Sequence, residues 1–206
     1  MAGAAVGGGR VAVLASGTGT ILEAVLAAGV PAVVVVADRP CHALTVAQRA
    51  GVETVLVDRH LWGGFGPGFD RHAYTEAVTA SLVERDVDLV AMAGFGTVLA
   101  EPVHDAFFGR ILDTHPSLLP AFPGWHAVAE ALDAGVALTG CTVHVATLEV
   151  DAGPVVAQEE VPVMVGDTVE TLHERIKAVE RRLYPETILR VLGGTVRAGG
   201  GVGALR

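Results

Sequence analysis

A histidine and two aspartates are the side chains of this sequence best suited to acid–base chemistry. His115 stands before a proline in the segment Asp113-Thr-His-Pro-Ser-Leu-Leu-Pro120, and Asp151 opens a second rigid segment, Asp-Ala-Gly-Pro. A residue that precedes proline avoids helical backbone, so we expect a loop that fixes the direction of the His115 imidazole. One histidine with one or two aspartates favours proton transfer and charge stabilisation over a nucleophilic triad.

Two other kinds of active site find no support in the motifs. A serine hydrolase of the α/β class needs a Gly-x-Ser-x-Gly turn, and the sequence contains none. The eight histidines are scattered and form neither an HExxH pair nor a Cys/His cluster, so we expect no metal site. His60, His72, His104 and His173 are expected to be surface or helix residues.

A glycine-rich turn, Ser16-Gly-Thr-Gly-Thr20, follows the first apolar run and precedes an amphipathic stretch. Glycines at a strand-to-helix turn let backbone N–H groups converge on an anion, which favours a phosphate site. Gly17 and Gly19, with Asp38 about 20 residues later, are also similar to a dinucleotide fingerprint, although Leu22 replaces its third glycine. On this motif alone, a phosphate monoester, NAD and a turn that binds nothing all stay open.

The elements that would position these groups follow a β-α-β-α rhythm, which is typical of a parallel sheet. Short apolar runs predict strands over 11–15, 31–37, 53–57, 89–93 and 110–114, and helical spacing predicts helices over 21–28, 43–50, 71–84 and 99–107. The valine-rich run 31–37 is typical of a strand covered on both faces. We therefore expect an α/β fold with a doubly wound, mostly parallel sheet.

The last third of the sequence has a different pattern. Residues 139–147 and 155–163 alternate between apolar and polar types and are joined by a turn-like Glu-Val-Asp-Ala-Gly-Pro, which predicts antiparallel hairpin strands. Asp167 and Glu170 have capping-box spacing and predict the start of a C-terminal helix.

That C-terminal helix should run to about Leu183, because Pro185 is expected to kink or end it. No internal repeat or interior linker is visible in the sequence. We expect a single domain over 1–206, with loose glycine-rich tails at about 1–9 and 193–206.

Composition narrows the class of protein. Apolar residues make up 51% of the 206 residues, enough for a core without disulfides, and 18% charged residues are too few for a disordered chain. The formal net charge is −9 and Lys177 is the only lysine, which argues against a nucleic-acid groove. No membrane span or signal peptide is visible, and Cys41 and Cys141 lack CxxC spacing, so we expect a reduced, cytoplasmic protein.

Together and in this order, these segments resemble the folate-dependent formyltransferase superfamily, in particular its phosphoribosylglycinamide formyltransferase branch. The resemblance runs from about Arg10 to Leu192. The segments that carry it are Ser16-Gly-Thr-Gly-Thr20, Ala93-Gly-Phe95, His115-Pro-Ser-Leu-Leu-Pro-Ala-Phe-Pro-Gly124, Gly140-Cys-Thr-Val-His144, Asp151-Ala-Gly-Pro154 and Glu180-Arg-Arg-Leu-Tyr-Pro185. Arg71-His-Ala-Tyr74 and Glu180 narrow it towards the glycinamide ribonucleotide branch.

The resemblance implies a one-carbon transferase with a Rossmann-like formyltransferase fold. Its expected reaction is formyl transfer from 10-formyltetrahydrofolate to the amine of glycinamide ribonucleotide, in de novo purine biosynthesis. The folate would be a co-substrate, and we expect no metal. The expected partners are small-molecule substrates, with neither nucleic acid nor membrane, and the expected state is a monomer or a homodimer.

The resemblance also implies roles for individual residues. His115 would stabilise the oxyanion of the tetrahedral intermediate, and Asp151 would orient His115 and pass protons from the amine to the leaving nitrogen. The turn would hold the phosphate, Glu180 the amine end, and Arg71 would lie along the substrate or the folate tail. The implied substrate-binding residues are Gly17, Thr18, Gly19, Thr20, Arg71 and Glu180. The implied folate-binding residues are Gly96, Thr97, Val98, Leu99, Thr142 and His144.

Asp113 departs from the family, which carries asparagine two residues before the catalytic histidine. Asparagine offers an N–H donor to the oxyanion, whereas an ionised aspartate offers only acceptors. The loss of one oxyanion donor typically costs ~3 kcal/mol. We therefore expect Asp113 in the active site either as a protonated acid, its pKa raised by burial and by Asp151, or as a base for altered chemistry.

Ile21 in the phosphate turn, Thr97 near the folate and Trp125 after the Pro-Gly pair are further departures from the family. Together with Asp113 they keep other functions open, because a fold does not fix a function. One is a divergent paralogue that formylates another amine, or a weak or inactive enzyme; another is a formyl-folate hydrolase. A non-catalytic dinucleotide-binding module is the third.

Overall fold

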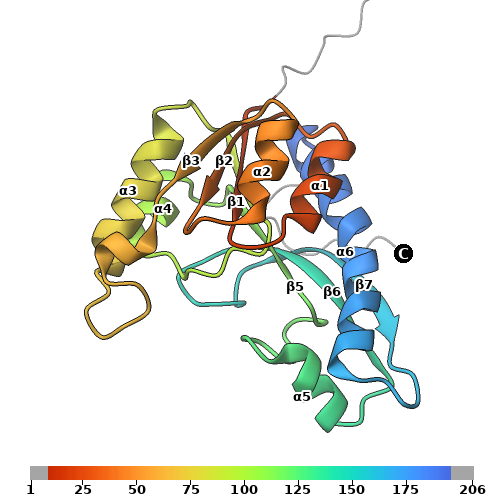
Figure 1. Cartoon of the computed structure of the whole chain (residues 1–206). Helices are drawn as coiled ribbons and strands as arrows, with labels where there is room; N and C mark the ends of the chain where they lie inside the picture. Colours follow the sequence, from red (N-terminus) through yellow and green to blue (C-terminus); the bar gives the residue numbers. More distant parts are fainter. Residues whose placement is uncertain (1–8, 196–206) are drawn as a thin grey trace, which may run out of the picture.

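The computed structural model describes residues 9–195, and its core is one seven-stranded sheet in the order β3-β2-β1-β4-β5-β6-β7 (Figure 1). The strands are β1 (Val11–Ala15), β2 (Ala32–Ala37), β3 (Glu53–Leu56), β4 (Leu89–Met92), β5 (Ile111–His115), β6 (Leu138–Val145) and β7 (Val155–Pro162). The helices are α1 (Thr20–Ala27), α2 (His42–Arg49), the 3-10 helix η1 (Arg59–Trp62), α3 (Arg71–Val83), α4 (Glu101–Ala106), α5 (Ala127–Asp133) and α6 (Val169–Leu192).

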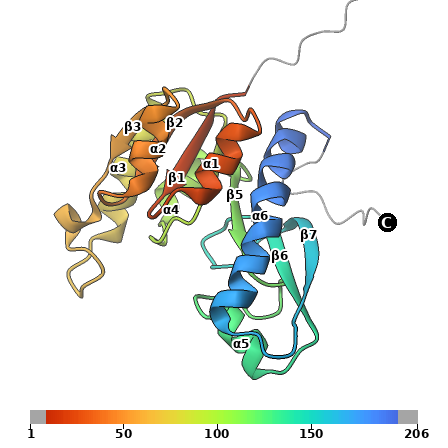
Figure 2. The same ribbon diagram turned by 45° about the vertical axis from the view of Figure 1, so that its right-hand side comes forward.

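Helices cover both faces of this sheet, as Figures 1 and 2 show. On one face α1, α2 and α6 pack against the odd-numbered residues of β1, and on the other α3 and α4 pack against Ala12 and Leu14. All five residues of β1 are fully buried, because this strand is sandwiched between the two layers. The predicted doubly wound α/β sheet is therefore confirmed.

The strand order creates a crevice at the carboxyl edge of the sheet. Strands β1 to β5 pair in parallel, and the connections after β1 and β4 leave towards opposite sides of the sheet. Ligands of open α/β sheets bind at such a reversal point, outside the carboxyl ends of the strands. The glycine turn follows β1 and the Ala-Gly-Phe segment follows β4, so both lie at this crevice.

The ladder between β5 and β6 places the polar residues of two strands on one face. The two strands are antiparallel, with Asp113 opposite His144 and His115 opposite Thr142. Side chains alternate along a strand and directly opposed residues share a face, so all four lie on the same side of the sheet. β7 extends the ladder in the antiparallel sense, which confirms the predicted hairpin.

The C-terminal helix differs from its prediction at both ends. Its capping box is formed by Thr168 and Thr171, whose side chains and backbone N–H groups bond reciprocally, rather than by Asp167 and Glu170. Asp167 instead accepts hydrogen bonds from the guanidinium of Arg175, at 2.7 and 2.8 Å. The sequence pattern therefore located the start of the helix correctly, but the capping residue is Thr168 instead of its neighbour Asp167.

The prediction that this helix ends near Leu183 is wrong, because α6 continues through Pro185 to Leu192. Pro185 is buried with Tyr184 and Ile188, and the Tyr184 hydroxyl donates to the Leu112 carbonyl at 2.8 Å. Proline removes one helical hydrogen bond. Packing against the sheet compensates for this loss, since tertiary contacts supply most of the stability of a protein helix.

The predicted tails and the single-domain assignment stay predictions. The predicted loose tails lie largely in 1–8 and 196–206, outside the described residues. The assignment of the whole chain to one domain stays a prediction. Between residues 9 and 195 no helix is both long enough and apolar enough to cross a bilayer.

Candidate active site

A cavity of about 440 Å³ occupies the crevice at the carboxyl edge of the sheet. Its walls come from the loops after β1, β4, β5 and β6 and from one face of α6. Of the residues proposed from the sequence, it is lined by Gly17, Thr18, Gly19, Thr20, Gly96, Thr97, Val98, Leu99, Asp113, His115, His144, Asp151 and Glu180. Segments as far apart in the chain as Gly17 and Glu180 thus meet around one space, as the β-α-β order requires.

The shape of the glycine turn requires a glycine at position 19. Gly19 has φ 83°, and a Cβ on it would lie 3.0 Å from the Ala43 Cα in α2. The turn is held to α2 by a bond from the Ala43 N–H to the Gly17 carbonyl, at 3.1 Å. No side chain caps the start of α1, so its first N–H groups are available to an anion in the cavity.

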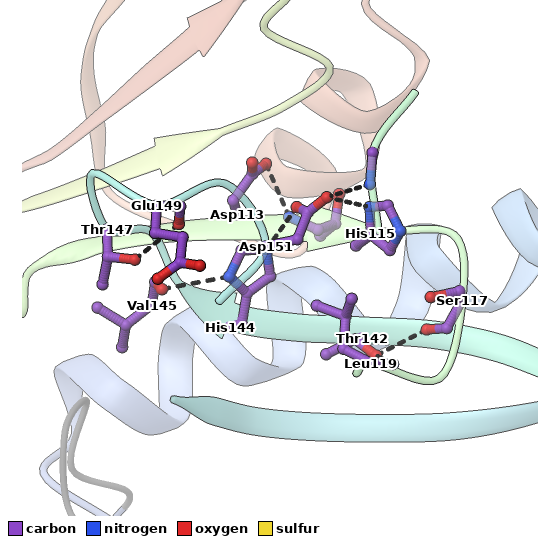
Figure 3. Close-up of polar contacts among 12 residues, drawn as sticks. Asp113, His115, Ser117, Leu119, Thr142, His144, Val145, Thr147, Glu149 and Asp151 are labelled. Carbon is purple, nitrogen blue, oxygen red and sulfur yellow. Dashed lines mark hydrogen bonds and ion pairs between the residues drawn. The ribbon is translucent and has the colours of Figure 1, made fainter. Parts of the chain in front are cut away.

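His115 and Asp151 both line the cavity, and Figure 3 shows the two side chains facing each other. The His115 Nε2 lies 2.7 Å from the Phe122 carbonyl, which only accepts, so Nε2 carries a hydrogen. The His115 Nδ1 lies 3.3 Å from the Asp151 Oδ2. This contact places an imidazole nitrogen beside a carboxyl oxygen, an arrangement suited to proton transfer.

The backbone around Asp151 holds its side chain against His115. Asp151 has φ 58°, a left-handed conformation that aspartate and asparagine tolerate better than most residues. Its Oδ2 also accepts the Gly124 N–H at 2.7 Å. A Cβ on Gly153 would collide with the Val145 carbonyl, so glycine is required where the loop folds back on β6. These contacts hold Asp151 and the loop that carries it against β6.

His144 lies beside this pair and is held neutral. Burial lowers its pKa, and its Nδ1 lies 3.2 Å from the Val145 carbonyl, so the hydrogen sits on Nδ1. Its Nε2 lies 3.6 Å from the Asp151 Oδ1 and has no hydrogen-bond partner among residues 9–195. A buried, unpaired acceptor of this kind indicates that the cavity takes a donor here.

Two further carboxyl groups face the cavity, and burial raises the pKa of each. Burial raises the pKa of Asp113 to about 7, with the nearby charges of Asp151 and Glu180 adding to the effect. Its Oδ1 accepts the Thr114 N–H at 2.8 Å, which leaves Oδ2 free. Burial also raises the pKa of Glu180, whose Oε1 accepts the Thr114 hydroxyl at 2.5 Å. At neutral pH a large fraction of Asp113 is thus an uncharged acid that can donate.

A second cavity of about 610 Å³ adjoins the first and shares Gly96, Val98 and Trp125 with it. It is lined by three guanidinium groups and two further aromatic rings, those of Arg39, Arg59, Arg71, Phe65 and Phe69. Arg59 is paired with Asp38, which lines the same cavity. The positive charges of Arg39 and Arg71 suit an anionic group, and the rings suit an aromatic one.

A buried pair anchors the loop between the two cavities. Asp38 is fully buried, and its Oδ2 accepts from the Arg59 guanidinium at 2.8 Å and from the Thr97 hydroxyl at 2.7 Å. The Thr97 hydroxyl is therefore committed to Asp38 rather than free for a ligand. The bond ties the loop after β4 to the end of β2.

The known proteins that this chain resembles agree with one another. A sequence model described as "Formyl transferase" matches residues 9–188. The chain belongs to the formyl transferase family. It is therefore a formyltransferase, and the enzyme class expected from the motifs is confirmed.

Curated relatives carry a common name. The phosphoribosylglycinamide formyltransferase of Mycobacterium tuberculosis (strain ATCC 25618 / H37Rv) is 48% identical over 181 residues, which cover 84% of this chain and 80% of that protein. The trifunctional purine biosynthetic protein adenosine-3 of Gallus gallus is 43% identical over 197 residues, 92% of this chain but 19% of that longer protein.

Solved structures agree on the fold. The crystal structure of glycinamide ribonucleotide transformylase 1 from Symbiobacterium toebii is similar with a TM-score of 0.83 and 40% identity, covering 93% of this chain and 94% of that one. The predicted mostly parallel sheet with antiparallel C-terminal strands and a C-terminal helix is thereby confirmed.

Two of the site residues proposed for the formyltransferase do not line the cavity that holds His115. Arg71 lines the second cavity and not the one that holds His115. Thr142 is fully buried below the main cavity and lines neither space. Its hydroxyl donates to the Ser117 carbonyl at 2.7 Å and accepts the Leu119 N–H at 3.1 Å, so it holds the loop after β5 in place (Figure 3).

The formyltransferase cavity also contains residues that the sequence reasoning missed. His173 and Lys177 line it from α6, next to Glu180, and His104 lines it from α4. His104 and His173 are helix residues as expected, but both face the cavity. The two residues of α6 could have been predicted from their spacing, because positions 173, 177 and 180 are four and three residues apart and share one face of a helix.

Proposed function

We propose that this formyltransferase moves the formyl group of 10-formyltetrahydrofolate to the primary amine of glycinamide ribonucleotide, a step of purine biosynthesis. The observation that carries the proposal is a single cavity that brings together a glycine turn with an uncapped helix start and a contact between His115 and Asp151, beside a second, arginine-lined cavity. The names of the relatives support the same substrate. A cytoplasmic location and a monomeric or homodimeric state stay predictions from the sequence.

The ribonucleotide would bind between the glycine turn and α6. The free N–H groups at Gly17–Thr20 suit its phosphate, and Lys177 supplies a positive side chain in the same cavity. The Glu180 carboxyl suits the amine end, because a carboxyl oxygen can accept a hydrogen bond from an amine N–H. This arrangement would place the amine next to His115 and Asp151.

The folate would enter from the other side. The cavity is lined by Gly96–Leu99, by His144 in β6 and by the loop that follows β6, and it offers mostly apolar surface to a pterin ring. Arg39 and Arg71 in the second cavity suit the carboxylates of the glutamate tail, which favours the folate alternative for Arg71.

The catalytic groups would then transfer protons between the amine and the folate. Attack of the amine on the formyl carbon forms a C–N bond and an oxyanion, and collapse breaks the bond to N10 of the folate. The amine loses one proton and N10 gains one, and the His115–Asp151 pair can accept the first and return it to N10. The acid form of Asp113 would donate a hydrogen bond to the oxyanion, the task of asparagine in the family.

The proposed activity is tested by following 10-formyltetrahydrofolate spectroscopically, with and without glycinamide ribonucleotide. We expect consumption that depends on the ribonucleotide and yields one formylated amine for each folate released. Formate release at the same rate without any amine would instead indicate a hydrolase. Binding of NAD, but no turnover, would indicate a dinucleotide-binding module.

The Asp113→Asn variant tests the role of the unusual carboxyl group. The acid form donates, so activity of the unmodified enzyme should fall as the pH rises through the Asp113 pKa of about 7. At about pH 8 roughly a tenth of the acid form is left, so the variant should be up to about tenfold faster there and similar at about pH 6. The measurement is a profile of kcat against pH for both proteins.

The pH dependence of thermal stability gives an independent test of whether Asp113 is protonated. The folded pKa is raised from its ordinary value of 3.8 to about 7, so the acid form stabilises the fold at low pH. This contribution is lost as the pH rises from the lower value to the upper one. Asp113→Asn should therefore unfold at a higher temperature than the unmodified enzyme above neutral pH. Matching pH profiles for both proteins would contradict the acid role.

A further inference from the structure

The segment 122–125 holds both members of the catalytic pair by its main chain. The Phe122 carbonyl accepts the His115 Nε2–H at 2.7 Å, and the Gly124 N–H donates to the Asp151 Oδ2 at 2.7 Å. Phe122 has φ 53° and Gly124 has φ 89°, so the segment is tightly turned. The position of residue 125 is thereby fixed relative to the reacting groups.

Trp125 directly follows this anchored backbone and lies where the two cavities meet. Its side chain lines both, together with Gly96 and Val98, and it is 73% exposed. Packing within the chain does not account for a large indole left open to solvent beside a catalytic centre. Aromatic side chains with one free face are suited to stack on an aromatic ligand.

The chemistry of the proposed co-substrate fixes the order of its parts. The N10 atom that carries the formyl group is bonded directly to a benzene ring, and that ring is joined through an amide to the glutamate carboxylates. If N10 lies at His115 and Asp151 and the carboxylates lie at the second cavity's arginines, the ring must lie at the junction. Trp125 is the aromatic residue that both cavities share.

We infer that Trp125 stacks on the aminobenzoyl ring of the folate and is a specificity-determining residue for the co-substrate. The inference rests on the proposed function, because it uses the connectivity of 10-formyltetrahydrofolate. It adds a recognition role for a side chain that departs from the family pattern. The contact acts on binding and leaves the proton-transfer groups in place.

Kinetics of Trp125→Ala test this role. Loss of one stacking contact should raise the KM for 10-formyltetrahydrofolate about tenfold. The KM for the ribonucleotide should stay unchanged and kcat should stay within about twofold, because His115 and Asp151 are held by main-chain bonds that the substitution keeps. Trp125→Phe should restore most of the affinity. Phe108→Ala is the matched control, since Phe108 is 88% exposed and lines neither of these cavities.

Two fragments separate ring stacking from general damage to the site. p-Aminobenzoylglutamate contains the ring and the tail, so its inhibition constant should rise about tenfold in Trp125→Ala. 6-Hydroxymethylpterin lacks the benzene ring, so its inhibition constant should be the same in both proteins. Equal weakening of both fragments, or of neither, would overturn the inference.

A binding measurement separates this inference from the proposed function. Calorimetric titration of folic acid needs no amine and no turnover, and its Kd should also rise about tenfold in Trp125→Ala. Transfer to the ribonucleotide with an unchanged folic acid Kd in the variant would overturn the role of Trp125 alone. Weakened folic acid binding in an enzyme that does not use the ribonucleotide would sustain Trp125 and refute the proposed acceptor.

Discussion

Replacing His115 by alanine should lower kcat by about 10³-fold, because a preorganised group facing the developing oxyanion is a large part of catalysis in acyl transfer. The imidazole is 5% exposed, is oriented by the Phe122 carbonyl and faces Asp151 across 3.3 Å. The substitution removes both the group that stabilises the oxyanion and one member of the pair proposed to transfer the proton. The measurement is steady-state turnover of 10-formyltetrahydrofolate with saturating ribonucleotide.

A matched control shows that the loss is chemical. His126→Ala removes a histidine that lines neither cavity and precedes α5, so its turnover should be close to that of the unmodified enzyme. The fold of His115→Ala is checked by its thermal unfolding, and its folic acid affinity should change little. If His115→Ala kept most of its kcat, the catalytic role of this residue would be wrong.

Replacing Asp151 by asparagine should lower kcat by about 10²- to 10⁴-fold, the range typical of a lost general acid–base group. The amide has the same shape as the carboxyl group but can neither accept nor return a proton. Asparagine also tolerates the left-handed backbone at φ 58°, so this change removes the chemistry and keeps the loop. Turnover should fall while the KM values stay within a few-fold.

The alanine variant separates chemistry from backbone conformation at the same site. Asp151→Ala lacks the side chain that bonds to the Gly124 N–H, and its Cβ is strained at positive φ. It should therefore unfold at a lower temperature than Asp151→Asn, although both are slow. An Asp151→Asn enzyme with nearly full kcat would show that the proton moves by a route that bypasses this carboxyl group.

The sheet and its order of elements could be predicted because hydrophobic periodicity is a local property of the sequence. The buried runs of β1 and β2 and the alternation in β6 and β7 each carry their own signal. The path of α6 through Pro185 could not be predicted in this way. It depends on contacts with β5, and no local pattern reports them.

The candidate site was predictable where chemistry and turn geometry coincide in a short segment. His115, Asp151 and the glycine turn are of this kind, and they lie in one cavity. The position of Arg71 in the neighbouring cavity and the supporting role of Thr142 depend on how distant loops meet. The raised pKa of Asp113 likewise arises mainly from burial, which one sequence cannot measure.

The main-chain bonds from Phe122 and Gly124 to the catalytic pair have a consequence for evolution. A point mutation changes a side chain but leaves the backbone carbonyl of Phe122 and the N–H of Gly124 in place. The neighbouring side chains can therefore diverge under selection for a different ligand while the proton-transfer groups keep their alignment. An enzyme lineage can in this way explore new one-carbon donors without first losing its catalysis.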